Sequence, residues 1–151
     1  MKIIVLFIFL LFVSRSISAE EYMYSTVGQP DLVMDFDSNT YIQGDAEARF
    51  ESCRYDGISF CIVVNNYYLA VPANVSKTVR IKLSDNDEFL FLPIKRTLSV
   101  LGQKVIGYEA SVRDFSNKEK TTVFFNQKQG VMFIRIEGII YWSSSENGIK
   151  L

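Results

Sequence analysis

The chain has 151 residues, with 16 basic and 17 acidic side chains and no histidine, so its formal net charge is −1. It carries no stripe of clustered basic residues, which disfavours binding to nucleic acid. The absence of histidine excludes Ser-His-Asp and Cys-His catalysis, most zinc and copper sites, and histidine-based pH switching near neutrality.

The N-terminus has the three-part layout of a secretory signal peptide, residues 1–19. Lys2 supplies a positive charge, residues 3–13 form an unbroken apolar run, and the residues that follow are mostly small and polar. As a helix this run extends about 16 Å, whereas a bilayer core of about 30 Å needs nearer 20 residues. We expect cleavage after Ala19; cleavage after Ser18 and an uncleaved N-terminal anchor are the alternatives.

Cleavage would leave one domain by length, residues 20–151. Loss of Lys2 and Arg15 lowers the basic count from 16 to 14 against 17 acidic residues, so the mature net charge is −3. No cysteine directly follows the apolar run to accept a lipid. We therefore expect a secreted or periplasmic protein with no lipid anchor and no stable membrane span.

Apolar and polar residues alternate with period two along this domain, and no long stretch carries a convincing helical stripe. Clusters of Asp, Asn, Ser and Gly separate the alternating segments. The sequence predicts an all-β, antiparallel fold of about eight to ten short strands, arranged as a barrel, a half-barrel or a sandwich. The expected strands are residues 32–36, 48–55, 58–65, 67–71, 78–83, 88–92, 104–113, 121–126, 131–137 and 139–142.

Cys53 and Cys61 are the only cysteines, and an oxidising compartment would join them. Asp56 and Gly57 between them are a strong hairpin signal, because glycine accepts a positive φ without steric cost. A two-residue loop would leave the cysteines one residue out of register, whereas a three-residue loop over residues 56–58 pairs position 53 with 61. Disulfide geometry favours the second register. A redox-active pair is the alternative, but the spacing differs from that of dithiol oxidoreductases.

Three pairs of adjacent aromatic residues stand out within the expected strands. Adjacent rings on a strand point to opposite faces, so one ring of each pair can enter the core while the other points outward. Outward rings would form a binding surface, and inward rings would line an apolar cavity if the sheet curls into a cup. A two-layer sandwich that covers both faces is the alternative. The candidate residues are Tyr67, Tyr68, Phe124, Phe125, Tyr141 and Trp142.

A weak calcium candidate lies at Asp35, Asp37 and Asn39, which have the alternating spacing that opens an EF-hand loop. The pattern then fails, because Thr40 replaces the expected glycine and Ala46 the expected glutamate. A β-turn rich in Asp, Ser and Asn explains the segment better. We therefore predict no metal site and no cofactor.

Other polar motifs give weaker signals. The carboxylates of Asp45, Glu47 and Glu51 are dense enough to suggest paired acid–base chemistry on a polysaccharide, but density is not geometry. Asn74 opens an Asn-Val-Ser acceptor sequence for N-glycosylation, which would matter only in a eukaryotic host.

The sequence therefore favours an exported, non-catalytic binding or interaction protein whose partner is a protein, a glycan or an apolar ligand. One form of this hypothesis is an inhibitor or immunity-type protein that uses its acidic N-terminal third against a basic enzyme. The alternative is a carrier that holds a lipid or another apolar ligand in a β cup. A small carboxylate-based hydrolase ranks third.

Overall fold

A computed structural model describes residues 20–100 and 103–151, and the predicted signal peptide lies outside them. The described chain is all-β, and every strand pairing in it is antiparallel, as the sequence predicts. In these two ranges, no helix has the length and apolar character needed to cross a bilayer. The strands are β1 Glu21–Ser25, β2 Leu32–Asp35, β3 Thr40–Gln43, β4 Ala46–Arg49, β5 Glu51–Ser52, β6 Ile58–Val64, β7 Tyr67–Pro72, β8 Val79–Lys82, β9 Asp87–Val100, β10 Gln103–Asp114, β11 Glu119–Asn126, β12 Gly130–Ile136 and β13 Ile139–Ser143.

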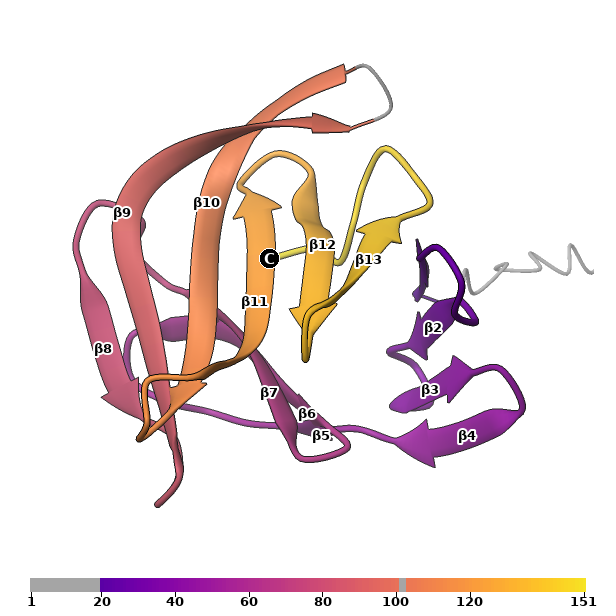
Figure 1. The fold of residues 1–151 in the computed structure, drawn as a ribbon, viewed down its shortest axis with the longest axis horizontal. Helices are drawn as coiled ribbons and strands as arrows, with labels where there is room; N and C mark the ends of the chain where they lie inside the picture. The colour runs from indigo at the N-terminus through magenta and orange to yellow at the C-terminus, as the bar shows by residue number, and fades with distance from the viewer. Residues whose placement is uncertain (1–19, 101–102) are drawn as a thin grey trace, which may run out of the picture.

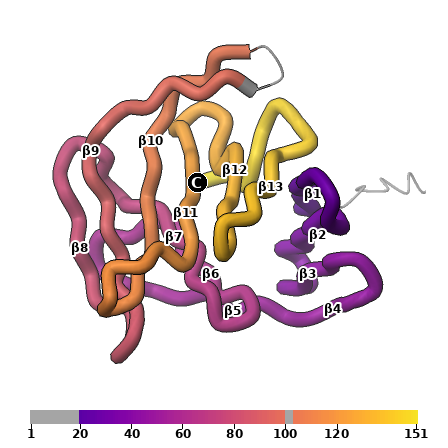
Figure 2. The backbone as a smooth tube through the Cα atoms, viewed as in Figure 1, coloured from indigo at the N-terminus to yellow at the C-terminus, as the bar shows by residue number. Residues whose placement is uncertain are grey.

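A ten-stranded sheet dominates the molecule, with the strand order β4-β3-β2-β1-β13-β12-β11-β10-β9-β8. It joins two meanders, β1–β4 and β8–β13, through a short pairing between β1 and β13. The sheet curls strongly from β8 round to β4, but β4 and β8 do not pair, so it does not close into a barrel (Figures 1 and 2).

A three-stranded sheet, β5-β6-β7, covers one face of the curled sheet. Strand β7 packs against β10 and β11, and the side chains between the layers form the core. Leu69 and Val71 of β7 are fully buried there, as are Phe91 of β9 and Phe125 of β11. We call the face of the large sheet that meets β5–β7 the inner face, and the opposite one the outer face.

The described strands outnumber the predicted ones, and β9 is much longer than predicted. Strand β9 has 14 residues and continues through Pro93, where the prediction ends it. The β9–β10 register shifts beside Pro93, between the Tyr108–Lys95 and Ala110–Phe91 pairs. Proline is tolerated at such a bulge, because its missing N–H is not needed for the ladder there.

The strand predicted over residues 48–55 is two strands in different sheets. Strand β4 is the edge of the large sheet, and β5 pairs with β6 of the small one. Phe50 lies between them, is 3% exposed, and packs in the core beside Phe36. Burial of this ring fixes the point at which the chain crosses from one sheet to the other.

Cys53 and Cys61 form a disulfide with Cα atoms 5.0 Å apart. The backbone N–H of Cys53 donates to the carbonyl oxygen of Cys61 at 3.0 Å, which is the predicted register. The turn itself is tighter than the three-residue loop, because the Ile58 N–H donates to the Tyr55 carbonyl oxygen and Gly57 has φ +88°. A two-residue turn would by itself leave the cysteines one residue out of register, so a compensating shift of one residue lies between the turn and the cysteines.

The C-terminal segment folds back across the start of β12. Ile149 forms an isolated antiparallel bridge with Val131 and is 2% exposed. Tyr24 of β1 is fully buried, and its hydroxyl donates to the Val131 carbonyl oxygen at 2.8 Å and accepts from the Ile149 N–H at 3.0 Å. One side chain thus ties both ends of the chain to β12, and burial raises the pKa of its phenol.

Candidate functional site

The structure divides the six candidate aromatic residues among three places. Phe125 and Tyr141 belong to the core between the layers and are 1% and 4% exposed, so they form no part of a contact surface. Tyr68 is half-buried and packs against the same core. Tyr67 lies with Tyr141 at a cavity between the sheets, and Phe124 and Trp142 lie on the outer face.

Phe124 and Trp142 belong to an aromatic ladder that also includes Phe133. Phe124 pairs with Phe133 across β11 and β12, and Phe133 pairs with Trp142 across β12 and β13. The first two rings stack with centroids 5.4 Å apart, and Phe133 meets Trp142 edge-on at 5.1 Å. The sequence reasoning missed Phe133, although the registers of the two hairpins would have placed it between the other rings.

The ladder lies outside the interlayer core, yet its first two rings are almost fully buried. The β9–β10 hairpin curves past the upper ends of β11 and β12, the strands that carry these two rings (Figure 1). A Cβ atom at Gly107 of this hairpin would lie 2.7 Å from Cζ of Phe124, so the ring occupies the space that a side chain would take. Trp142, at the end of the ladder, is only half-buried.

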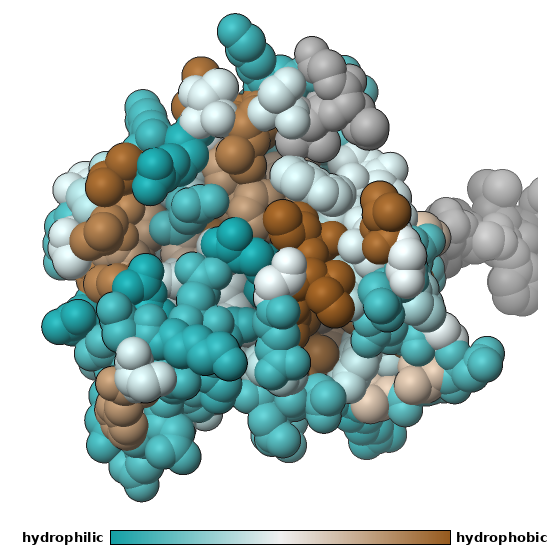
Figure 3. Space-filling view, viewed as in Figure 1, coloured by the Kyte–Doolittle hydropathy of each residue, from teal (hydrophilic) through white to brown (hydrophobic). Residues whose placement is uncertain are grey.

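An open pocket of about 600 Å³ lies beside Trp142. It lies between the end of β1, the end of β13 and the β9 side of the long hairpin. Figure 3 shows this outer face, where hydrophobic side chains gather in separate patches among polar ones. The described residues that line the pocket are Ser25, Thr26, Val27, Ser99, Trp142, Ser143 and Ser144.

The pocket combines an indole ring, an apolar side chain and hydroxyl groups. Val27 is 99% exposed at its edge. The hydroxyls of Ser25 and Ser144 hydrogen-bond to each other at 2.7 Å, which fixes the rim where β1 meets β13. Every described residue that lines the pocket is uncharged, so the lining offers a ligand apolar contact and hydroxyl partners but no acid or base.

The cavity between the sheets is smaller, at about 120 Å³. Gln43 of β3 spans it by donating to the Tyr141 hydroxyl at 2.7 Å. At its edge, the neighbouring Glu137 carboxylate raises the pKa of the Tyr67 phenol. Its walls are therefore tied together across the space.

The weak calcium candidate is a hydrogen-bonded turn. Asp35 accepts the backbone N–H of Asp37 at 2.8 Å and the hydroxyl of Ser38 at 2.8 Å, and these bonds hold the pKa of its carboxyl below the ordinary range. Asn39 adopts φ 55°, the left-handed conformation that turns require. Within residues 20–100 and 103–151, no group of three or more acidic, cysteine or histidine side chains is placed to hold a metal ion.

The carboxylates considered for hydrolysis lie on both sides of the crossing from the large sheet to the small one. Asp45 is in the β3–β4 turn, Glu47 is on β4 and Glu51 is on β5, and all three are exposed.

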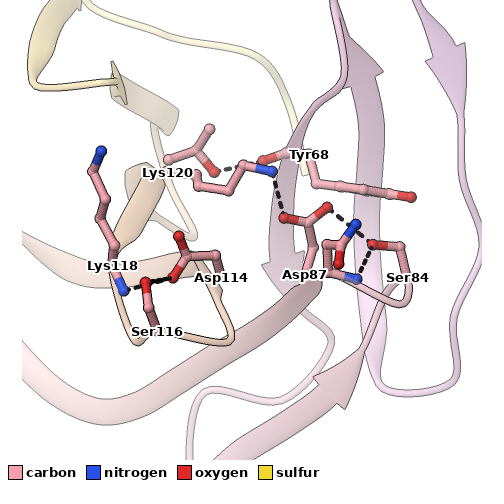
Figure 4. Close-up of polar contacts among 9 residues, drawn as sticks. Tyr68, Ser84, Asp87, Asp114, Ser116, Lys118 and Lys120 are labelled. Atoms are coloured by element: carbon pink, nitrogen blue, oxygen red, sulfur yellow. Dashed lines mark hydrogen bonds and ion pairs between the residues drawn. The ribbon is translucent and has the colours of Figure 1, made fainter.

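The most buried ion pair in the described chain joins β9 to β11. Asp87 Oδ1 lies 2.6 Å from Nζ of Lys120, and its Oδ2 accepts the Ser84 hydroxyl at 2.9 Å (Figure 4). The Asp87 side chain is 8% exposed and that of Lys120 30%. Both oxygens of the carboxylate are engaged, so this cluster closes the β8–β9 turn rather than presenting a free group.

Comparisons with protein-family models, with curated proteins and with solved structures find no match to this chain.

Proposed function

We propose that this chain is an exported, non-catalytic binding protein that holds its ligand in the pocket beside Trp142. The observation that carries the proposal is the composition of that pocket: a half-buried indole, an exposed valine and a set of hydroxyls, with no charged residue in the described lining. A volume of about 600 Å³ suits a small-molecule ligand, since such sites span roughly 300–1,000 Å³.

The lining chemistry favours an uncharged ligand with an apolar face and hydroxyl groups. The indole of Trp142 offers a flat apolar surface for a sugar ring or an alkyl chain. Serine and threonine hydroxyls both donate and accept hydrogen bonds, so they match the hydroxyl groups of a sugar. A glycan or a glycolipid headgroup has both features.

The dimensions of the interlayer cavity support this site over the carrier hypothesis. A lipid carrier needs an enclosed volume of several hundred cubic ångströms. The cavity between the layers is about 120 Å³, and side chains of β6 and β7 pack into the core on the inner face of the large sheet.

Fluorescence tests the proposal directly, because Trp142 is the only tryptophan of the chain. We expect cellobiose, or octyl glucoside below its micelle concentration, to shift the emission of the mature protein with a saturating dependence on concentration. Calorimetry should then show that Trp142→Ala abolishes the heat of binding.

A matched control is Phe115→Ala, which removes a 66%-exposed aromatic ring from the β10–β11 turn, away from the pocket lining. This variant should bind as the unmodified protein does. The proposal fails if neither probe alters the emission, or if both substitutions weaken binding equally.

A further inference from the structure

A second hollow, of about 340 Å³, lies between the β9–β10 hairpin and the turn that joins β11 to β12. Its lining differs from that of the Trp142 pocket, because it contains two lysines and no acidic residue among the described positions. Lys95 comes from β9, and Lys128 comes from the β11–β12 turn. We call this hollow the lysine pocket.

Neither lysine of the pocket forms an ion pair with another described residue, although six ion pairs occur among the described residues. Both side chains are exposed. The whole chain has a formal net charge of −1, so a hollow with two cations and no described acid is more positive than the chain as a whole. Concave sites lined by one sign of charge concentrate ligands of the opposite sign.

The turn that carries Lys128 is held in place by a set of hydrogen bonds. The Asn126 side-chain oxygen accepts the N–H of Lys128 at 3.0 Å and that of Gln129 at 2.6 Å. The Gln129 carbonyl oxygen in turn accepts the N–H of Gly148 at 2.8 Å, which ties the turn to the C-terminal segment. The backbone that presents this ammonium group is therefore fixed before any ligand arrives.

The opposite wall carries apolar side chains next to Lys95. Ile106 is 59% exposed, and the Tyr108 ring is anchored by the rings of Phe91 and Phe125 at 5.9 and 6.0 Å. Lys95 pairs with Tyr108 across the two strands, so a cation and an aromatic ring stand side by side on this wall. An anion that also carries an apolar ring would contact both kinds of surface.

We propose that the lysine pocket binds a small organic anion, through its carboxylate or phosphate group at Lys95 and Lys128 and its apolar part at Ile106 and Tyr108. Ammonium groups form charge-assisted hydrogen bonds with either kind of anionic oxygen. This site is separate from the Trp142 pocket and shares no lining residue with it.

Calorimetry with four probes tests the site on the mature protein at low ionic strength, where surface electrostatics are least screened. The probes are phenyl phosphate, phthalate, inorganic phosphate and benzyl alcohol. We expect one or both of the organic anions to bind at least tenfold more tightly than inorganic phosphate and benzyl alcohol. Phenyl phosphate alone would identify a phosphate site, and phthalate alone a carboxylate site.

Two double variants separate a pocket from a general charge effect. Lys95→Gln with Lys128→Gln should weaken binding of the preferred probe about tenfold or more, since charge-assisted bonds are lost. Lys77→Gln with Lys118→Gln makes the same change of net charge at exposed residues elsewhere and should weaken binding less than twofold. Trp142→Ala should leave it unchanged.

Three results would overturn the proposal: no binding of either organic anion at 10 mM, equal binding of benzyl alcohol and the anions, or equal losses in the two double variants. Equal affinity for inorganic phosphate and phenyl phosphate would also overturn it, because Ile106 and Tyr108 would then contribute nothing. Circular dichroism of each variant keeps a folding defect from being mistaken for a binding defect.

Discussion

Replacing Tyr24 with phenylalanine should destabilise the protein by removing one hydroxyl from its interior. The ring is fully buried, and its hydroxyl joins the Val131 carbonyl oxygen to the Ile149 N–H. Phenylalanine keeps the ring contacts but leaves both backbone groups unpaired in a dry environment. An unpaired buried donor or acceptor costs about 1–3 kcal/mol, so we expect a loss of about 2–4 kcal/mol in the free energy of unfolding.

Urea denaturation monitored by circular dichroism gives this free energy, and amide hydrogen exchange shows where the loss occurs. The amide of Ile149 should exchange faster in the variant, because its hydrogen bond to the phenol is gone. Tyr22→Phe is the matched control: it lies on the same strand, is partly buried, and packs edge-on against Phe36 at 5.7 Å. No protein hydrogen bond of the Tyr22 hydroxyl occurs within the described residues, so this change should cost less than about 0.5 kcal/mol.

A Tyr24→Phe variant with a free energy of unfolding within about 0.5 kcal/mol of the unmodified protein, and with unchanged exchange at Ile149, would contradict this role of the hydroxyl. That outcome would mean that the C-terminal segment is held by the packing of its apolar side chain alone. A loss of stability without faster exchange at Ile149 would also contradict it, because the effect would then arise elsewhere.

Three further substitutions test other parts of the fold. Replacing both Cys53 and Cys61 with serine should lower the free energy of unfolding by about 2.5 kcal/mol, because the closed loop no longer restricts the unfolded chain. Urea denaturation measures this change, and an unchanged midpoint would contradict it. Gly107→Ala should cost about 1–3 kcal/mol in a thermal melt, because the new Cβ would clash with the carbonyl oxygen of Phe125. An unchanged melting temperature would show that the hairpin moves aside at little cost. The Asp35 carboxyl should titrate below its ordinary pKa of 3.8 by NMR, and Ser38→Ala should raise that pKa because the carboxylate loses the hydrogen bond from the Ser38 hydroxyl. This carboxylate therefore contributes stability that is complete above the unfolded-state pKa and is lost as the pH falls through the lower folded-state pKa. Equal titration midpoints of Asp35 in the unmodified protein and in Ser38→Ala would exclude Ser38 as the cause.

Features that depend on a few neighbouring residues could be predicted from the amino-acid pattern. Period-two alternation gave an all-β, antiparallel chain, because side chains of a strand point alternately to its two faces. The disulfide and its register followed from Asp56-Gly57 and the spacing of Cys53 and Cys61, and the turn at Asp35 followed from its Asp-Ser-Asn composition.

The pairing of strands that lie far apart in the sequence depends on tertiary packing. The β1–β13 pairing joins residues more than a hundred positions apart, and nothing local in either strand specifies it. The same is true of the crossing at Phe50 and of the bulge that carries β9 through Pro93. Period two assigns adjacent rings to opposite faces, but which face is covered depends on the layer that packs against it.

The two candidate sites likewise combine features that the local sequence indicates with features that depend on tertiary packing. The sequence pattern indicated Trp142 as one member of an aromatic pair. Its pocket also contains Ser25 and Val27, which lie more than a hundred residues away in the sequence. Lys95 and Lys128 belong to no sequence motif, and they line the same hollow because the long hairpin packs beside the β11–β12 turn. The Trp142 pocket lies where strands distant in sequence converge, whereas the lysine pocket lies among consecutive strands of one meander. In both cases the packing of strands around the shared core, rather than a local pattern, brings the lining residues together.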